Sequence, residues 1–310
     1  MKQFIIIILI FLLACEKEVE LDIPQSPPQL LVNAILMPTQ NVEVYVSLSQ
    51  YVMDTFVTTI SDAIVELYCD NDLVAQLTHS EDGKYSQQGI LPQVGKTYSL
   101  TVDVDGFETA TAQTTVPNSI ALDSLVITQN IGVNNNGDKT SAFDLYFNKN
   151  DKVENYYSYA CIGGTDPIDS TFYDTGDTII TYYETGGIST LSCYHPAILK
   201  DGDEQSRIFS DKEIESDLIN LKLFTSFLVW NLPTATYTFE INAQINALSK
   251  EQYLFHKSLE NYYTQQGQIL GGNTLPHIYS NVNNALGCFS AITPGNIVIK
   301  YEEVECEGWR

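Results

Sequence analysis

Positive charge is scarce in this chain of 310 residues, where 15 lysines and arginines stand against 39 aspartates and glutamates. The formal net charge of −24 excludes a nucleic-acid partner, because a phosphate backbone requires a basic footprint. The same deficit argues against docking on an anionic lipid leaflet through protein charge. A hydrophobic fraction of 44% nevertheless predicts a folded body with a real core.

Several catalytic motifs are also missing. The chain has four histidines and no HExxH, CxxC, GxSxG or phosphate-loop pattern. These absences exclude the common zinc protease, dithiol redox, serine-elbow and nucleotide-phosphate sites. We therefore expect no enzymatic activity, and a hydrolase with a dispersed pair of carboxylates is kept as the third alternative.

No apolar run is long enough to span a bilayer as a helix. The longest, Ile5 to Leu13, follows the basic Lys2 and leads to Leu12-Leu13-Ala14-Cys15. A basic start, a short apolar stretch and a small residue at the cut are typical of a secretory signal. The ending resembles a bacterial lipoprotein signal, so residues 1–14 are predicted to be removed and Cys15 to be acylated, for example with palmitate.

Acyl chains on Cys15 would hold the protein firmly at a membrane. Residues 15–29 carry three prolines without apolar periodicity, which predicts an extended tether. The Glu16-Lys17-Glu18 start resembles export signals of Bacteroidetes surface lipoproteins. We therefore expect an outer-membrane protein exposed at the cell surface.

Residues 30–117 alternate apolar and polar positions with period two, which predicts short strands. Turn residues punctuate them at Asp70-Asn71-Asp72, at Ser80 to Gly83 and at Asp105-Gly106. The spacing predicts a β-sandwich of immunoglobulin or transthyretin type. The stretch from Gly83 to Pro117 resembles transthyretin-like and carboxypeptidase-regulatory-like modules.

Residues 118–310 predict a second β domain that resembles a sandwich. Leu221 to Trp230 and Tyr237 to Ile245 are interpreted as a long strand pair joined by a turn. One helix is expected over about 249–266, because Ser249 suits the N-cap and Gln252 the capping-box position. The whole chain is thus predicted to be mainly β with one helix near its C-terminus.

Four phrases carry a wider resemblance, namely Pro28-Gln29-Leu30-Leu31-Val32, Ser249 to Tyr253, Tyr279-Ser280-Asn281 and Leu286-Gly287-Cys288-Phe289. Together with the lipoprotein start, they resemble the Bacteroidetes lipoproteins gathered as domain of unknown function 4249 (DUF4249). This chain has Asn284-Ala285 where that family usually has a glycine pair. A loop that needs positive φ at both positions is therefore in question.

The resemblance implies a non-enzymatic accessory of a TonB-dependent outer-membrane transporter, which captures a small peptide, glycan or metal-chelate ligand or gates the transporter. A surface adhesin or glycan-binding lipoprotein is the second alternative. Exposed tyrosines make good contact surfaces for either role. The expected binding surface comprises Tyr157, Tyr183, Tyr263, Tyr279 and Asn281.

Five cysteines remain after Cys15, so at most two disulfides can form outside the cytoplasm. Neighbours in sequence suggest the pairs Cys161 with Cys193 and Cys288 with Cys306, although connectivity cannot be deduced. Cys69 lies in an alternating strand and is expected to be a free, buried thiol.

One acidic loop is a weak candidate for Ca²⁺. Asp201, Asp203 and Gln205 place oxygen ligands at alternate positions, yet the glycine and terminal glutamate of an EF-hand loop are missing. A solvated turn is the favoured interpretation, and no other cofactor is expected.

Overall fold

The computed structural model describes the backbone of residues 27–51, 56–133, 139–149, 154–164, 168–173, 179–184, 187–188, 192–193, 207–228, 235–266 and 276–306. Within these ranges, side chains are left undescribed at 163–193, 226–228, 235–237, 266 and 304–306. The described chain is mainly β and contains one helix, α3 (Lys250–Gln266), so both predictions are confirmed. The expected sandwiches stay a prediction, because strand pairing joins sixteen strands into one sheet, fourteen along a single path and two beside it.

The first module contains residues 30–116 together with 282–291. Its strands are β1 (Leu30–Leu36), β2 (Glu43–Leu48), β3 (Ile64–Cys69), β4 (Asp72–His79), β5 (Lys84–Ser86), β6 (Thr97–Asp103) and β7 (Ala110–Thr115). Alternate residues of β1, β2 and β6 are buried, as the period of two predicts. Their inward side chains form one core, to which Val282, Phe289 and Ala291 contribute from the far end of the chain.

Two of the predicted turns in this module have the backbone that tight hairpins need. Asp70 and Asn71 both adopt positive φ, at 49° and 76°, and join β3 to β4. Asp82 and Gly83 do the same between β4 and β5, at 48° and 71°. Asp, Asn and Gly tolerate this conformation, which explains why local sequence located the turns correctly.

The second module contains residues 120–248 and 292–306. Its strands are β8 (Leu122–Val133), β9 (Lys139–Asn148), β10 (Tyr156–Gly164), β13 (Gly187–Ile188), β14 (Ser192–Cys193), β15 (Ile208–Ser210), β16 (Leu218–Leu228), β17 (Ala235–Leu248) and most of β18 (Phe289–Cys306). β11 (Ile168–Tyr173) and β12 (Ile179–Glu184) form a separate pair. A second core lies inside this module and includes Phe143, Phe147, Phe209 and Phe239.

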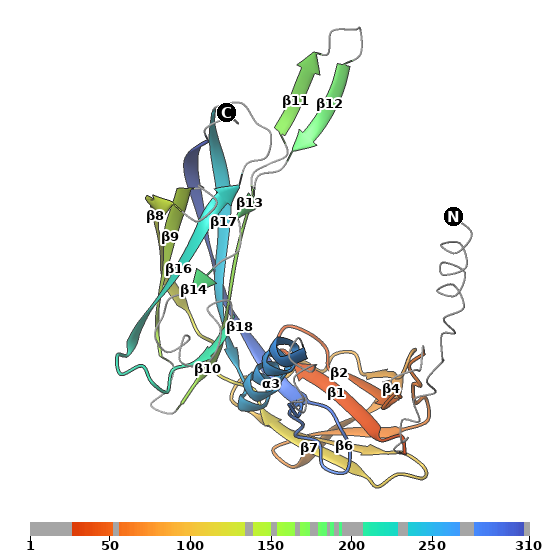
Figure 1. The fold of residues 1–310 in the computed structure, drawn as a ribbon. Helices are drawn as coiled ribbons and strands as arrows, with labels where there is room; N and C mark the ends of the chain where they lie inside the picture. The colour runs from red at the N-terminus through yellow and green to blue at the C-terminus, as the bar shows by residue number, and fades with distance from the viewer. Residues whose placement is uncertain are drawn as a thin grey trace, which may run out of the picture.

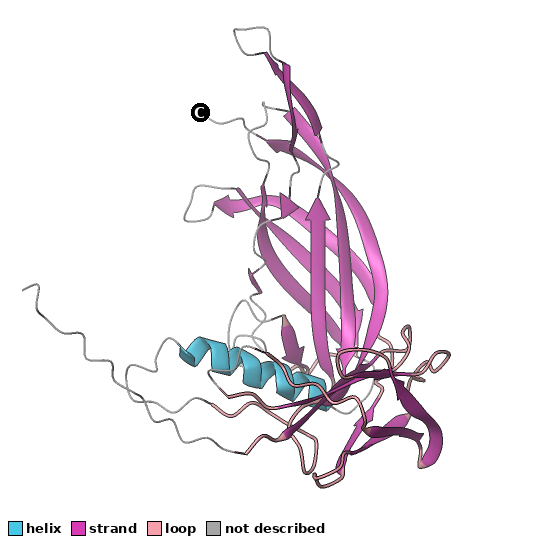
Figure 2. Ribbon diagram, turned by 90° about the vertical axis from the view of Figure 1, so that its right-hand side faces the viewer, coloured by secondary structure: helices cyan, strands magenta, loops and turns pink. Residues whose placement is uncertain are grey.

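Strand β18 belongs to both modules. It starts parallel to β1, with Ala34 opposite Phe289, and then runs antiparallel to β17 as far as Cys306. Figure 1 shows the two modules meeting at an angle, with α3 at the corner and the strands of the second module upright. Figure 2 shows α3 lying across the foot of those strands. The predicted domain boundary at residue 117 assigns all later residues to the second domain. In the structure, residues 282–291 return to the first module.

Strands β16 and β17 are not a pair, so that prediction is wrong. The order along the sheet is β17-β10-β13-β16-β9, and β16 pairs with β9 along most of its length. β17 pairs instead with β10 and β18. In both strands every second side chain is apolar and faces inward. This pattern shows which face of a strand is buried, but it does not show which strand lies beside it.

Candidate functional site

A cleft of about 380 Å³ opens where the two modules meet. Four segments line it: the loop at Gly95, the end of β7 with the linker to residue 118, the start of β10 around Tyr156, and the turn from β17 into α3. Cavities of this size hold small ligands in many proteins. The cleft is therefore the candidate functional site of the described chain.

Tyr156 forms one wall of the cleft, and α3 holds its ring in place. The ring stacks on Tyr253 with centroids 4.7 Å apart and planes inclined by 29°. Burial, followed by the negative charge of Glu154, raises the pKa of Tyr156 to about 12. The phenol thus stays protonated and neutral at neutral pH.

Opposite charges line the same cleft. Glu154 is exposed and accepts a hydrogen bond of 2.9 Å from Ser210 Oγ to its Oε1 atom. Lys250 is the exposed first residue of α3 and forms no ion pair among the described residues. One carboxylate, one ammonium group and one phenol suit a small polar ligand that carries charge of both signs.

A buried network supports the wall behind Tyr156. Asp211 is 3% exposed and accepts hydrogen bonds from the Asn155 backbone amide at 2.8 Å and from the Tyr157 hydroxyl at 3.0 Å. The Asn155 side-chain amide donates a further bond of 2.8 Å to the same carboxylate. Since Tyr157 is fully buried against Phe147 and Phe209, its prediction as a binding-surface residue is wrong.

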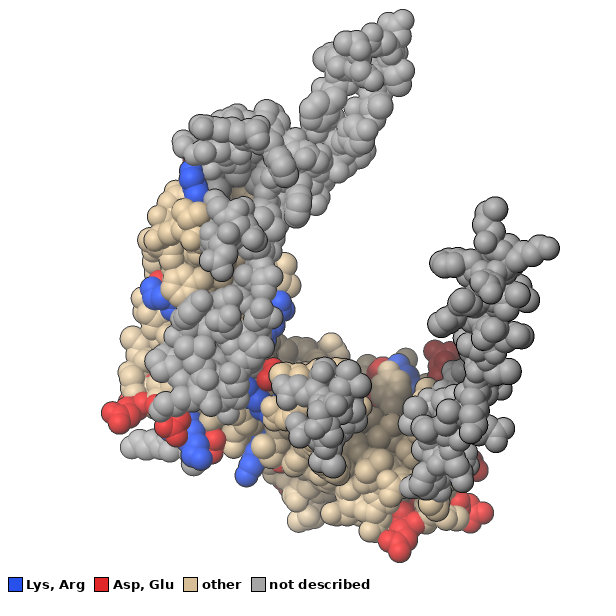
Figure 3. Space-filling model, viewed as in Figure 1, with Lys and Arg blue, Asp and Glu red and all other residues tan. Residues whose placement is uncertain are grey.

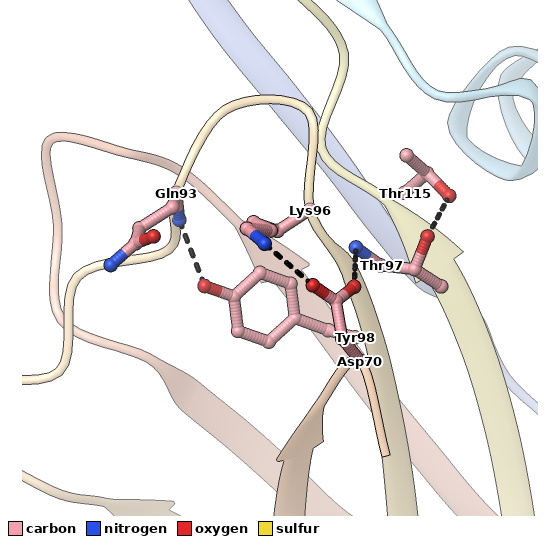
Figure 4. A network of polar contacts seen from close by, with 6 residues as sticks. All are labelled: Asp70, Gln93, Lys96, Thr97, Tyr98 and Thr115. Carbon is pink, nitrogen blue, oxygen red and sulfur yellow. Dashed lines mark hydrogen bonds and ion pairs between the residues drawn. The ribbon is translucent and has the colours of Figure 1, made fainter. Parts of the chain in front are cut away.

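The loop that brings Gly95 to the cleft is fixed by polar contacts at the end of the first module (Figure 4). Lys96 Nζ lies 2.7 Å from Asp70 Oδ2, and the Thr97 amide donates to Asp70 Oδ1 at 3.3 Å. The Tyr98 hydroxyl accepts from the Gln93 amide at 2.9 Å. The hydrogen bond from Lys96 lowers the pKa of Asp70, so this carboxylate stays ionised.

The helix that borders the cleft begins as predicted at its N-cap but not at its capping box. Ser249 Oγ accepts from the Gln252 amide at 3.3 Å and from the Ala291 amide at 3.1 Å. The Gln252 side chain does not return to the Ser249 amide, because that amide already donates to the Ala291 carbonyl. Gln252 Oε1 instead accepts a short hydrogen bond from Ser290 Oγ.

Asn281 holds the fold together, so the structure gives it a different role from the predicted one. Its Nδ2 atom donates to the Phe289 carbonyl at 2.8 Å, and its Oδ1 atom accepts from the Phe289 amide at 2.9 Å. A weaker bond of 3.3 Å reaches the Gln113 carbonyl. The amide is therefore occupied in joining β7 to β18.

Two neighbouring asparagines, which were not among the predicted binding residues, act in the same way. Asn283 exchanges backbone hydrogen bonds with Thr111, and Asn284 Nδ2 donates to the Thr109 carbonyl at 3.1 Å. On the other side, Leu286 bonds to β1 through Leu30 and Val32. We call residues 279–289 the closing segment, because they join the two open edges of the first module. The sequence signal that could have located this segment is its cluster of asparagines beside a glycine.

The predicted tyrosines are scattered over the molecule. Tyr263 is 65% exposed on α3 and stays a candidate contact residue. Tyr279 is half-buried beside α3, where its amide donates to Ser258 Oγ at 2.9 Å. Tyr183 lies on β12, and its side chain is outside the described residues. The structure thus does not bring these residues together with Tyr157 and Asn281 into one surface.

The two suggested disulfides are wrong for Cys161 and Cys288, which are buried free thiols. Cys288 directly precedes β18 and Cys306 ends it, so an extended strand on the order of 50 Å separates them. A disulfide needs Cα atoms within about 7 Å. Cys161 faces the core of the second module, and burial raises its pKa to about 12. Cys69 is free as predicted, although it is half-buried.

Other predicted sites fall on residues that the structure leaves undescribed. These are Cys15, the side chains of Cys193 and Cys306, and the Ca²⁺ candidates Asp201, Asp203 and Gln205. Among the described residues, no group of three or more histidines, cysteines or carboxylates is placed to hold a metal ion. Within the same ranges, no helix combines the length and apolar character that a membrane crossing requires.

Comparison with known proteins gives one strong match. The model of a family described as "Domain of unknown function (DUF4249)" matches residues 16–297. No curated protein matches the chain. The crystal structure of a "Putative membrane anchored protein" from Corynebacterium diphtheriae is 16% identical over 73% of this chain, with a TM-score of 0.22. The chain spans about half of that protein, 55% of its length, and the likeness carries no argument about fold or function.

Proposed function

This chain belongs to the family described as domain of unknown function DUF4249, and we propose that it is a lipid-anchored, non-enzymatic binding protein of the outer membrane. Cys15 is the proposed anchor, because it follows a short apolar run and a small residue. The proposed role is to capture a small ligand beside a TonB-dependent transporter. Residues 16–29 would act as the tether between anchor and body.

The junction cleft is the observation that carries the proposal. It takes its walls from both modules and presents Tyr156, Glu154 and Lys250 around a volume of about 380 Å³. A short peptide offers an ammonium group for Glu154, a carboxylate for Lys250 and apolar groups for the tyrosine ring. We therefore propose a short peptide as the ligand class, with a glycan or metal chelate as other outcomes of the test.

The anchor and partner are tested in cells of the source organism. Mild crosslinking and purification through a C-terminal tag should recover a TonB-dependent transporter with the wild-type chain. A Cys15→Ser variant should leave the membrane fraction and lose the transporter. Failure to recover any transporter, or normal uptake in a deletion strain across peptide, glycan and metal-chelate substrates, would contradict the proposal.

The cleft is tested separately from the partner. Tyr156→Ala and Lys250→Glu should lower uptake of a short-peptide substrate at least tenfold while the transporter is still recovered. Tyr263→Ala is the matched control, since this exposed tyrosine lies outside the cleft lining. Unchanged uptake in both cleft variants, with the transporter still bound, would remove ligand capture and leave an accessory role.

A glycan-binding surface protein is the second candidate. The exposed Tyr263 ring lies 5.7 Å from the Tyr262 ring with the planes inclined by 83°, and exposed aromatic rings suit contact with a sugar. Glycan-array binding by the purified protein that is abolished in Tyr263→Ala would favour this role over transport.

A further inference from the structure

Four exposed apolar side chains share one face of the second module. Ile162 on β10 is 69% exposed, and Ile297, Ile299 and Tyr301 on β18 are 59%, 53% and 64% exposed. Single exposed apolar residues are common, whereas four of them on one face offer a surface for a partner. We call these four residues the apolar strip.

Strand register places the strip on one face, with Asn242 between Ile162 and the β18 residues. Asn242 on β17 lies opposite Ile162 on one side and opposite Ile299 on the other, so all three point to the same face. Ile297 and Tyr301 flank Ile299 at two-residue steps. At strand spacings of about 4.8 Å and steps of about 3.3 Å per residue, the strip covers roughly 10 by 13 Å.

Helix α3 already covers the foot of this same face. The row Tyr156–Leu248–Ile292 has the same orientation as the row Ile162–Asn242–Ile299. Tyr253 and Leu254 of α3 pack on the row Tyr156–Leu248–Ile292. Figure 2 shows the helix at the foot of the strands, with the sheet continuing beyond it. Among the described residues, α3 covers the lower part of this face and leaves the strip exposed.

Polar side chains within the strip are bonded to their neighbours. Asn242 Nδ2 donates to Glu240 at 3.0 Å, and Gln244 Nε2 donates to the Gly295 carbonyl at 2.8 Å. The Tyr301 hydroxyl also donates to Glu240, at 3.2 Å. These three donor groups would therefore keep their acceptors when the strip is covered, which lowers the cost of burying it.

Charge around the strip identifies the chemistry of its partner. Glu240 and Glu303 are exposed and point to this face, and no lysine or arginine shares it among the described rows of β10, β17 and β18. Figure 3 shows lysine and arginine scattered over the visible face of the molecule rather than gathered in a patch. With a net charge of −24, a second copy of the chain or an anionic lipid surface would be repelled.

We propose that the apolar strip binds a protein partner through a segment in which apolar side chains are flanked by lysine or arginine. Apolar contacts at the centre and charge complementarity at the rim are the usual anatomy of a specific interface. This proposal rests on the proposed function only in its choice of partner, because we expect that partner to be the transporter. It deepens that function by naming the surface that docks.

The test places a photo-crosslinking amino acid at Ile162 and at Ile299 in cells, and at Leu73 as control. Leu73 is 56% exposed on β4 of the first module, which matches the 53% of Ile299. Both strip positions should crosslink the same protein, and mass spectrometry should locate the contact in an apolar segment with basic neighbours. Leu73 should not crosslink that protein.

Variants then measure the contribution of the strip. Ile299→Glu should lower recovery of that partner at least tenfold, because a buried charge would face its apolar segment. Glu303→Lys should lower it about threefold and make it less sensitive to salt. Leu73→Glu should leave recovery unchanged. All three variants should unfold within a few degrees of the wild type, since each position is exposed.

The outcomes separate this proposal from the proposed function. Crosslinks to a transporter support both, while crosslinks to another basic–apolar protein support the strip and contradict the transporter. Recovery of a transporter through the tag without any crosslink from the strip overturns the strip alone. Adducts only to a second copy of the chain or to lipid also overturn it.

Discussion

Two residues of the closing segment hold backbone conformations that few side chains accept. Gly287 has φ of 121°, and a Cβ atom placed there would lie 1.9 Å from the Val32 carbonyl oxygen. Asn284 has φ of 60°, in the left-handed region that asparagine tolerates. The question raised by Asn284-Ala285 is thereby answered, because positive φ is adopted at Asn284 and not at Ala285.

Gly287→Ala is expected to destabilise the protein by about 3 kcal/mol or more, since strained φ and a backbone clash act together. Urea unfolding followed by circular dichroism measures the change. Gly132→Ala is the matched control, because Gly132 has no atom within 4 Å of its virtual Cβ and no positive φ. Equal stability of the two variants would refute the close approach of the closing segment to β1.

Asn284 separates backbone strain from side-chain bonding. Both Asn284→Gly and Asn284→Val lose the bond to the Thr109 carbonyl, but glycine accepts φ of 60° and valine does not. We expect the glycine variant to stay within about 1 kcal/mol of the wild type and the valine variant to lose about 1–3 kcal/mol more. If thermal unfolding shows a smaller loss of stability in the valine variant than in the glycine variant, the positive φ at Asn284 is contradicted.

Buried thiols should be protected from alkylation. Burial raises the pKa of Cys161 to about 12 and that of Cys288 to about 11, so both stay protonated at pH 8. Iodoacetamide should therefore label these cysteines slowly in the folded protein and rapidly in 6 M guanidinium chloride. Peptide mapping reads out each site, and intact disulfides at either cysteine before reduction would contradict the structure.

Among the secondary-structure elements, α3 shows how one side chain joins a helix to a sheet. Ser249 Oγ caps the helix through the Gln252 amide and also accepts from Ala291 on β18. Tyr253 then packs onto Tyr156 at the cleft. The position of the cleft wall thus depends on a single cap.

Ser249→Ala should cost about 2 kcal/mol, since it removes a cap and leaves the buried Ala291 amide without its acceptor. Chemical denaturation provides the measurement. Thr264→Ala is the control, because its hydroxyl bonds only the Glu260 carbonyl within the exposed end of α3 and should change stability by less than about 0.5 kcal/mol. Comparable losses of stability in the two variants would show that the Ser249 hydroxyl stabilises the protein no more than an exposed hydroxyl does.

Sequence patterns predicted those elements whose determinants are local. The turn at Asp70-Asn71 and the cap at Ser249 depend on neighbouring residues, and both are present. The partners of β16 and β17 depend on strands far away in the chain, which periodicity does not identify. Neighbours on a strand face opposite sides, so one of Tyr156 and Tyr157 must face inward, and the prediction chose Tyr157 wrongly as the outward one. The buried Asp211 and Phe209 that select Tyr157 are more than fifty residues away.

The candidate site was predicted less well than the fold. Its cleft joins four segments that no motif links, so composition offered no reason to combine Tyr156 with Lys250. The asparagines of the closing segment resemble binding residues because they are polar and clustered. The partners of Asn281 and Asn284 are backbone groups of β18 and of Thr109, just before β7, and they become visible only when the strands are placed.

At the scale of the whole molecule, the two modules depend on one returning strand. β18 completes the first module beside β1 and the second beside β17, and Phe289 is fully buried in the first core. The closing segment then bonds the free edge of β7. Edges left open in this way are prone to aggregate and do not enclose a core.

Residues 27–117 alone should therefore fail to fold, although they contain all seven strands of the first module that precede the linker. The same residues joined through a glycine–serine linker to 276–292 should show a cooperative thermal transition, because Val282, Phe289 and Ala291 then complete the core. A chain joined to a scrambled 276–292 segment is the control. Cooperative unfolding of residues 27–117 without the segment would show that these residues form an independent domain. The family-like sequence at 279–289 would then have a role other than folding the first module.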